Sequence, residues 1–328
     1  MEQAWVAPGA GAPMDMPGTT ASFPAVEPAS ARPSATAPIG IFDSGMGGLT
    51  VARAISRELP FESILYVGDT KRCPYGVRTG DEIRGFVRQI GAWFSRRSVK
   101  LIVIACNTAT AAALPLAQRT FDVPVIGVID PGARAAIQTT QTRRVGVIAT
   151  PLTIASDAYA QAIHRIDVGV SVTSLATPRF VPLVEEELAT GRHLHEDWRR
   201  NREVFLTDEV RAVVREDLAP LEHSGIDTLV LGCTHFPLLT PVIREVMGPD
   251  VSIVSSAEET TRSVVETLTR RRQLAAPGSL VRHRFATTSD DITTFAAAGG
   301  FIFGRPLASI EHIDIEELEY LDAQTPRG

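Results

Sequence analysis

Cysteine is scarce in this chain: only Cys73, Cys106 and Cys233 occur among its 328 residues. An odd and low number of cysteines argues against a disulfide framework and favours a reducing compartment, so we expect a cytoplasmic protein. The paired Cys-x-x-Cys spacing of thiolate metal sites is also missing, and we expect no metal.

Long apolar runs are absent as well, and none approaches the roughly 20 residues that a membrane-spanning helix needs. Positive charge is not in excess, because the net charge is −6. These two observations argue against a membrane partner and against nucleic acid. Apolar residues make up 44% of the chain and charged residues 21%, close to the averages of a soluble globular protein.

Nucleotide and pyridoxal signatures are missing too. The turn at residues 43–48 (DSGMGG) separates an aliphatic run from the amphipathic run at residues 49–55. Such a strand, turn and helix directs backbone N–H groups toward an anionic group, although a tight turn that needs glycine explains it equally well. No Gly-Lys-Ser/Thr follows, the dinucleotide fingerprint fits poorly, and no pyridoxal-type lysine is evident. We therefore expect no cofactor.

The first 37 residues differ from the rest in composition. They are rich in Ala, Pro, Gly, Ser and Thr, contain one basic residue, Arg32, and show no hydrophobic periodicity. The charged start and apolar core of a secretory signal are not present. Because this segment cannot bury enough apolar surface to offset its ordering entropy, we expect residues 1–37 to be a disordered extension outside the fold.

Two short stretches in the remaining chain repeat one another. Residues 101–110 read LIVIACNTAT, and residues 229–238 read LVLGCTHFPL. Each begins with the continuous aliphatic run of a strand that is buried on both faces, and each continues with a cysteine and polar residues. Ligands of open α/β sheets bind at the carboxyl ends of strands. We therefore expect Cys106 and Cys233 at two such strand ends.

The elements around these stretches recur in the same order. Strands are expected over residues 38–42, 63–68, 124–131, 144–150 and 251–254, and helices over residues 49–55, 81–94, 155–163 and 257–272. Strand, turn and helix, followed later by a strand and a cysteine, occur in both halves. This repeat predicts an α/β fold with two pseudo-symmetric lobes, each with a mostly parallel sheet flanked by helices, and an active site in the cleft between them. The charged stretch at residues 188–215 is expected to be a solvated helical face.

Four interpretations of the two thiols differ in how many thiols they use. In the first, the cysteines are isolated buried residues, which are usually inert. In the second they bind a metal, but the paired Cys-x-x-Cys spacing of such sites is missing. A nucleophile with a histidine base accounts for Cys233, which has His235 beside it, but not for Cys106. A racemase uses both, since one thiolate can remove a proton from one face of a carbon while a thiol protonates the other face. The pKa of a free cysteine, ~8.5, suits such work once it is tuned.

At these residues the chain resembles the glutamate racemases, from about Ile39 to the C-terminus. The shared motifs are IFDSGMGG at 41–48, GDT at 68–70, PYG at 74–76, ACNT at 105–108, FVPLVE at 180–185 and GCTH at 232–235. The resemblance implies cofactor-independent interconversion of L- and D-glutamate, which supplies D-glutamate for peptidoglycan synthesis. It also implies a first lobe of residues 38–131 and 240–328 and a second lobe of residues 132–239. We further expect a homodimer.

The resemblance also implies roles for individual residues. Cys106 would take the proton from D-glutamate and Cys233 from L-glutamate, with Asp43 assisting the first thiol and His235 and Glu185 the second. The residues implied to bind substrate are Asp43, Ser44, Tyr75, Gly76, Asn107, Thr108, Thr234 and His235. Within this set, the Tyr75-Gly76 turn would present exposed N–H groups to the side-chain carboxylate.

The chain departs from the family pattern at two places. Thr177 stands where many relatives carry a further cysteine, and the interval from Glu185 to Cys233 is longer than is common, which affects the placement of Glu185. Cys73 is expected to be a bystander. A racemase for aspartate or another acidic amino acid is the alternative within the same chemistry. A non-catalytic acidic amino-acid binding protein is the alternative from another class, although a binder would not need two thiols.

Overall fold

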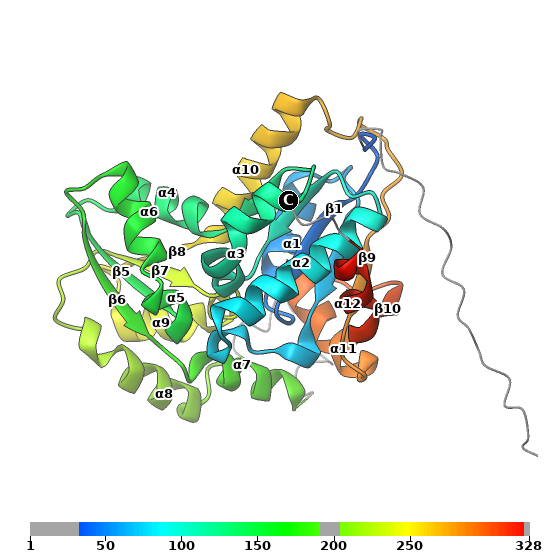
Figure 1. The fold of residues 1–328 in the computed structure, drawn as a ribbon. Coiled ribbons are helices and arrows are strands. Elements are labelled where there is room, and N and C mark those ends of the chain that lie inside the picture. Colours follow the sequence, from blue (N-terminus) through cyan, green and yellow to red (C-terminus); the bar gives the residue numbers. More distant parts are fainter. Residues whose placement is uncertain (1–32, 191–203, 325–328) are drawn as a thin grey trace, which may run out of the picture. The chain divides into compact units, whose positions relative to one another are not determined.

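The computed structural model describes residues 33–190 and 204–324, which contain two parallel β-sheets covered by helices (Figure 1). The first sheet has six strands in the order β10-β9-β2-β1-β3-β4, and the second has four in the order β6-β5-β7-β8. The strands are β1 (Ile39–Asp43), β2 (Ile64–Gly68), β3 (Leu101–Ile104), β4 (Val125–Gly127), β5 (Arg144–Ala149), β6 (Ser171–Ala176), β7 (Thr228–Gly232), β8 (Ser252–Ser255), β9 (Arg284–Thr287) and β10 (Ile310–His312).

Helices connect the successive parallel strands. The α-helices are α1 (Leu49–Glu58), α2 (Gly80–Arg96), α3 (Asn107–Thr120), α4 (Ile129–Thr139), α5 (Pro151–Ala155), α6 (Ala158–Ile166), α7 (Phe180–Ala189), α8 (Asp208–Leu218), α9 (Thr240–Met247), α10 (Ser256–Arg271), α11 (Ile292–Phe303) and α12 (Ile315–Ala323). Short 3-10 turns are η1 (Thr70–Arg72), η2 (Tyr75–Val77), η3 (Ala219–Leu221) and η4 (Phe236–Leu239).

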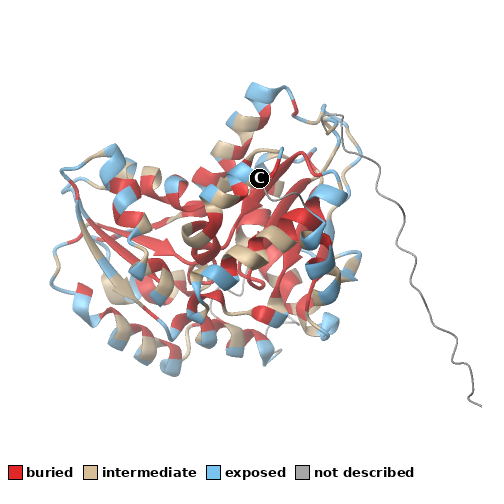
Figure 2. Ribbon diagram, viewed as in Figure 1, coloured by how far each residue is buried: buried red, intermediate tan, exposed pale blue. Residues whose placement is uncertain are grey.

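The aliphatic runs form strands because both faces of each sheet are covered. Successive residues of a strand point to opposite faces. In β1, Ile41 packs into the apolar cluster that includes Leu49 of α1, whereas the next residue, Phe42, packs into the cluster that includes Val87 of α2. The central strands β1, β2, β3 and β7 are accordingly buried throughout, whereas the edge strands β6, β8 and β10 carry exposed residues (Figure 2). A strand with two covered faces needs apolar residues throughout, which is why continuous aliphatic runs predicted the sheets correctly.

The internal repeat expected from the sequence is present. The order β2-β1-β3-β4 in the first sheet corresponds to β6-β5-β7-β8 in the second. Thus β5 corresponds to β1, and β7 corresponds to β3. The two cysteine-bearing stretches therefore follow equivalent strands.

The second sheet extends further along the chain than the lobe boundary at residue 239 allows. Strand β8 pairs with β7, so residues 252–255 belong to the second sheet rather than to the first. In the repeat, β8 corresponds to β4, the strand beside β3. Helix α4 leads from the first sheet to the second and α10 leads back, and α10 packs against both α1 and α4.

A further difference concerns the strand expected over residues 124–131. Only Val125–Gly127 is a strand, and α4 begins at Ile129, with Pro131 in its first turn. Proline is compatible with the first turn of a helix, where its missing N–H has no intrahelical partner. Pro131 therefore lies at the start of a helix and does not end a strand.

The last residues of the expected N-terminal extension contact the core. Residues 1–32 lie outside the described part of the chain, but the carbonyl of Pro33 accepts from Gln273 Nε2 at 3.0 Å. The carbonyl of Ala35 accepts from Lys100 Nζ at 2.5 Å, and Lys100 is fully buried and paired with Glu62 at 2.5 Å. Pro33 and Ala35, which were expected to lie in the extension, therefore contact the fold. Composition could not reveal this, because backbone carbonyls make these contacts.

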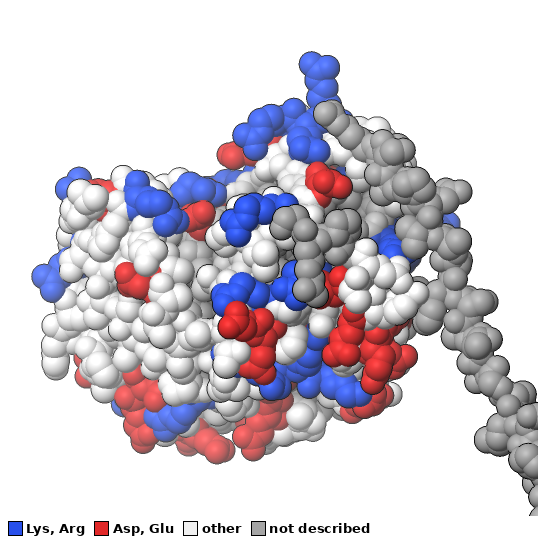
Figure 3. Space-filling view, in the orientation of Figure 1, with Lys and Arg blue, Asp and Glu red and all other residues white. Residues whose placement is uncertain are grey.

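Charged side chains of both signs share the surface. On the face drawn in Figure 3, basic and acidic residues are interspersed. Of the charged stretch expected to be a solvated helical face, residues 191–203 lie outside the described residues, and its neighbours form the end of α7 and the start of α8. Among the helices of residues 33–190 and 204–324, none is long and apolar enough to cross a membrane.

Candidate active site

The two thiols lie at equivalent positions of the two sheets. Cys106 follows β3 after one residue and is the N-cap of α3, and Cys233 directly follows β7. Their residues are only 5% and 8% exposed. The sequence therefore correctly predicted two thiols at the carboxyl ends of repeated strands.

Asp43 connects the first glycine-rich turn to the second cysteine loop. It is the last residue of β1 and is fully buried. Its Oδ2 accepts the N–H groups of Gly45 at 3.2 Å and Gly48 at 3.0 Å, and its Oδ1 accepts the hydroxyl of Thr234 at 3.2 Å. Burial raises the pKa of the Asp43 carboxyl, although nearby His235 and these hydrogen bonds oppose the shift. Asp43 is thus a buried carboxyl group held by contacts from both cysteine-bearing halves.

The turn after Asp43 needs glycine where it meets the second cysteine loop. A β-carbon built on Gly47 would lie 2.6 Å from Thr234 Oγ1 and 2.7 Å from His235 Nδ1. No side chain fits there without moving that loop. Gly47 therefore lets the side chains of Thr234 and His235 approach the backbone of this turn closely.

The Cys106 thiol is held by its neighbours in the first half. Its Sγ accepts the N–H of Ala109 at 3.4 Å and donates to Ser44 Oγ at 3.8 Å. Burial, together with the negative charge of Asp43, raises the pKa of Cys106 to about 12. In this environment Cys106 is a thiol at neutral pH, which is the form that can donate a proton.

The Cys233 thiol has a different environment. His235 Nδ1 lies 3.9 Å from Cys233 Sγ, and on the other side of the ring Nε2 lies 2.7 Å from Glu185 Oε1. Burial alone would lower the pKa of His235, but the contacts with Cys233 and Glu185 raise it well above its ordinary value. The pKa of Glu185 is lowered despite burial, because it accepts the hydrogen bond of His235. His235 is therefore an imidazolium held between Glu185 and Cys233.

Asn107 and Thr108, expected to bind substrate, both meet residues of the second half. Asn107 Oδ1 accepts the phenol of Tyr159 at 2.6 Å, and its Nδ2 is buried without a partner among the described residues. Thr108 Oγ1 lies 2.9 Å from Thr150 Oγ1 and 3.2 Å from Thr153 Oγ1. The sequence prediction had not assigned Thr150, Thr153 and Tyr159 to the site. Thr150 could have been found, because it directly follows β5, the counterpart of the strand that ends in Asp43.

The Pro-Tyr-Gly turn is buried, contrary to the expectation of an exposed backbone. Tyr75 is 1% exposed and its phenol donates to Asp69, which also accepts from Arg72 Nε at 2.7 Å. Gly76 packs on the second half, where an added β-carbon would lie 2.8 Å from the Thr150 Cβ. Proline and glycine in the sequence predict an exposed turn, but contacts with the second half of the chain bury it.

The third cysteine lies beside the same cluster. A β-carbon built on Gly45 would lie 3.3 Å from Cys73 Sγ and 3.4 Å from Glu185 Oε1. Burial, followed by the charge of Glu185, raises the pKa of Cys73 far above its ordinary value. Cys73 is therefore a neutral thiol, and that it is a bystander in proton transfer stays a prediction.

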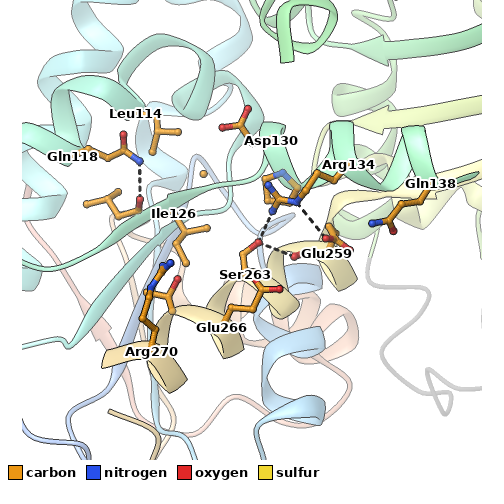
Figure 4. A pocket seen from close by; sticks show the side chains of 14 residues that line it. Leu114, Gln118, Ile126, Asp130, Arg134, Gln138, Glu259, Ser263, Glu266 and Arg270 are labelled. Carbon is orange, nitrogen blue, oxygen red and sulfur yellow. Dashed lines mark hydrogen bonds and ion pairs between the residues drawn. The ribbon is translucent and has the colours of Figure 1, made fainter. Parts of the chain in front are cut away.

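A recess of about 490 Å³ lies away from the thiols, between α3, β4, α4 and α10 (Figure 4). Across it, Arg134 bonds Ser263 at 2.7 Å and lies 3.4 Å from Glu259. None of the residues assigned to the site from the sequence lines this recess. The recess therefore does not contain the residues that are expected to carry out chemistry. The candidate active site is the cluster formed by the two thiols and their polar partners.

Known proteins resemble this chain over most of its length. The sequence model of the Asp/Glu/Hydantoin racemase family matches residues 39–264. The glutamate racemase of Shouchella clausii is 50% identical over 279 residues, which cover 84% of this chain and 95% of the relative. The crystal structure of glutamate racemase isoform RacE1 from Bacillus anthracis is similar with a TM-score of 0.76 at 40% identity, covering 85% of this chain and 98% of the other.

A second solved structure includes a ligand. The glutamate racemase of Francisella tularensis, in complex with D-glutamate, is similar with a TM-score of 0.74 at 31% identity, over 85% of this chain and 98% of the other. The family match covers well over half of the chain, and the solved structures have the same two-sheet α/β fold. The chain therefore belongs to the Asp/Glu/Hydantoin racemase family and is an isomerase.

Proposed function

We propose that this protein is a glutamate racemase that interconverts L- and D-glutamate by proton transfer between two cysteines, without a cofactor. The observation that carries the proposal is the pair of buried thiols at equivalent strand ends, each with its own polar partners. The similarity to glutamate racemases of 50% and 40% identity supports glutamate as the substrate. The product D-glutamate would serve peptidoglycan synthesis.

The two thiols divide the reaction between them. In the L-to-D direction the Cys233 thiolate takes the α-proton on one face, and the Cys106 thiol gives its proton to the opposite face of the same carbon. The Cα–H bond breaks and a new one forms, and the enzyme is left with a Cys233 thiol and a Cys106 thiolate, ready for the reverse reaction. Cys106 begins this direction as the thiol that its raised pKa favours, and the protonated His235 lies 3.9 Å from Cys233 Sγ.

The partners of the thiols have corresponding proposed roles. Asp43 assists Cys106, since its charge acts on that thiol, and His235 with Glu185 assists Cys233. The residues proposed to hold the amino-acid head and the side-chain carboxylate are Asp43, Ser44, Tyr75, Gly76, Asn107, Thr108, Thr234 and His235. For Tyr75 and Gly76, which are buried in the substrate-free site, this role requires the two halves to separate when substrate enters.

The larger organisation is proposed from the same features. The two sheets with their helices act as two lobes, and the second lobe continues through β8 to residue 255. The free cysteines among the described residues support a cytoplasmic location. A homodimer remains a prediction, which sedimentation of the purified protein would test.

The direct test is to incubate the purified protein with L-glutamate, without added cofactor, and to follow optical rotation. We expect the signal to decay to zero as the mixture becomes racemic, and incorporation of deuterium at Cα when the solvent is D₂O. Decay with aspartate and not with glutamate would favour the alternative acidic amino-acid racemase. Binding of glutamate without any decay would favour a binding protein. Activity that appears only with pyridoxal phosphate would contradict the proposed mechanism.

A further inference from the structure

Tyr159 links the residue beside Cys106 to the second half of the molecule. It lies on α6, and its phenol donates to Asn107 Oδ1 at 2.6 Å. Asn107 is the first residue of α3, directly after Cys106. Both side chains belong to buried residues, Tyr159 at 2% and Asn107 at 3% exposure. A short hydrogen bond between two buried groups has little freedom to rearrange.

The position of the Tyr159 ring is defined from two sides. A β-carbon built on Gly132 of α4 or on Gly232 of β7 would lie 3.0 Å from a ring carbon, so neither glycine leaves room for a side chain. Gly232 directly precedes Cys233. Burial raises the pKa of the Tyr159 phenol, so the phenol keeps the proton that it donates to Asn107 Oδ1.

The hydrogen bond from Tyr159 determines which way the Asn107 amide faces. An asparagine amide carries an acceptor oxygen on one side and a donor NH₂ group on the other. Because Oδ1 faces the phenol, Nδ2 faces the opposite way, where it is buried without a partner among the described residues. Burial of an unpaired donor is costly, which makes this group a ready donor to a carboxylate. If the amide turned over, its oxygen would meet the carboxylate and repel it.

We propose that Tyr159 is a positioning residue for substrate binding, which fixes the Asn107 amide so that its NH₂ group donates to a carboxylate of the bound amino acid. This inference rests on the proposed function. It extends that function by assigning substrate affinity to a residue of the second half that lies outside the cysteine motifs. Tyr159 acts through Asn107 and does not exchange protons with the α-carbon.

Tyr159→Phe tests this role, since it removes the hydroxyl and keeps the ring between its two glycines. We expect KM to rise roughly tenfold for both enantiomers, as for the loss of one charge-assisted hydrogen bond, while kcat stays within about twofold. The carboxylate has the same charge in the substrate and in the transition state, so its hydrogen bond stabilises both equally. Loss of that hydrogen bond therefore raises KM and leaves kcat nearly unchanged. The matched control is Tyr320→Phe, the same change at an exposed tyrosine of α12, which we expect to leave both constants unchanged.

A double-mutant cycle separates positioning from a general structural effect. In an Asn107→Ala background, Tyr159→Phe should lower kcat/KM by less than about twofold, because the amide through which it acts is gone. A full tenfold effect in that background would overturn the inference, and so would an unchanged KM in Tyr159→Phe alone. Wild-type protein that binds and converts neither enantiomer would instead overturn the proposed function, and the inference with it.

Discussion

His235 Nε2 lies 2.7 Å from Glu185 Oε1, so a carboxylate on α7 orients the imidazole that faces the second thiol. The long interval between Glu185 and Cys233 along the chain put the placement of Glu185 in question. In the fold, that interval does not separate them. Glu185, His235 and Cys233 form a continuous series of contacts, with 3.9 Å between the imidazole and the thiol.

Glu185→Gln should therefore remove the carboxylate that raises the pKa of His235, the imidazole beside Cys233. We expect kcat/KM to fall by roughly ten- to a hundredfold, within the range of general acid–base effects. Because the equilibrium constant of a racemisation is one, the loss must be equal for both enantiomers. Steady-state polarimetry from each enantiomer would measure it. Glu186→Gln, at the exposed neighbouring residue of α7, is the matched control and should retain full activity.

Asp43→Asn tests the electrostatics of the first thiol. The negative charge of Asp43 contributes to the raised pKa of Cys106, about 12, so its removal should lower that pKa. At pH 8 the thiolate fraction then rises about tenfold for each unit of pKa lost, and because a less basic thiolate is a weaker nucleophile, iodoacetamide should alkylate Cys106 about threefold faster. Peptide mass spectrometry distinguishes Cys106 from the other cysteines.

Racemisation should fall in the same variant, because Cys106 loses its carboxyl partner. The amide can keep the contacts with Gly45, Gly48 and Thr234, so a change in folding is not expected. Alkylation of Cys106 that is unchanged or slower would show that Asp43 does not control this thiol.

Gly47→Ala should damage the site by crowding. The new methyl group would lie 2.6 Å from Thr234 Oγ1, so the second cysteine loop must move. Overpacking of this kind costs about 1–3 kcal/mol of stability, and we expect at least a tenfold loss of activity. Gly85→Ala is the control: no atom lies within 4 Å of its added carbon, and alanine stabilises a helix interior by about 1 kcal/mol. Thermal melting and polarimetry compare the two variants, and an active Gly47→Ala enzyme would contradict the close approach.

Residues 33–37 should contribute to stability. A chain that begins at Pro38 lacks the Ala35 carbonyl that accepts from the buried Lys100. Lys100 keeps Glu62 and the Gln273 carbonyl as partners, so the change removes one hydrogen bond to a charged group, worth about 1.5–3 kcal/mol. We expect a chain starting at Pro38 to melt at a lower temperature than one starting at Pro33. Equal melting temperatures would show that Lys100 does not need this partner.

Sequence alone was sufficient for the features that follow from local pattern. The aliphatic runs ending at Cys106 and Cys233 predicted buried parallel strands, and their repetition predicted two equivalent sheets. Family motifs brought Glu185 and Asp43 into the list of candidates, and the structure places both beside the thiol loops.

The features that sequence could not supply depend on contacts between distant segments. Tyr75 is buried because the second half covers its turn, and Tyr159 reaches Asn107 only because α6 packs against the strand end of Cys233. Neither residue has a local signal for its partner. The same is true of Ala35, whose carbonyl contacts a lysine 65 residues away in sequence.

The central claim is that Cys106 and Cys233 face opposite sides of the same carbon, and the two serine variants test it most directly with a glutamate analogue carrying a leaving group on the β-carbon. Neither variant should racemise glutamate, because serine is too weak an acid to exchange the proton at neutral pH. The remaining thiolate can still remove the α-proton of the enantiomer it faces, and loss of the leaving group makes that step irreversible. The account predicts elimination from the D enantiomer only in Cys233→Ser and from the L enantiomer only in Cys106→Ser. Elimination of the same enantiomer by both variants would contradict it.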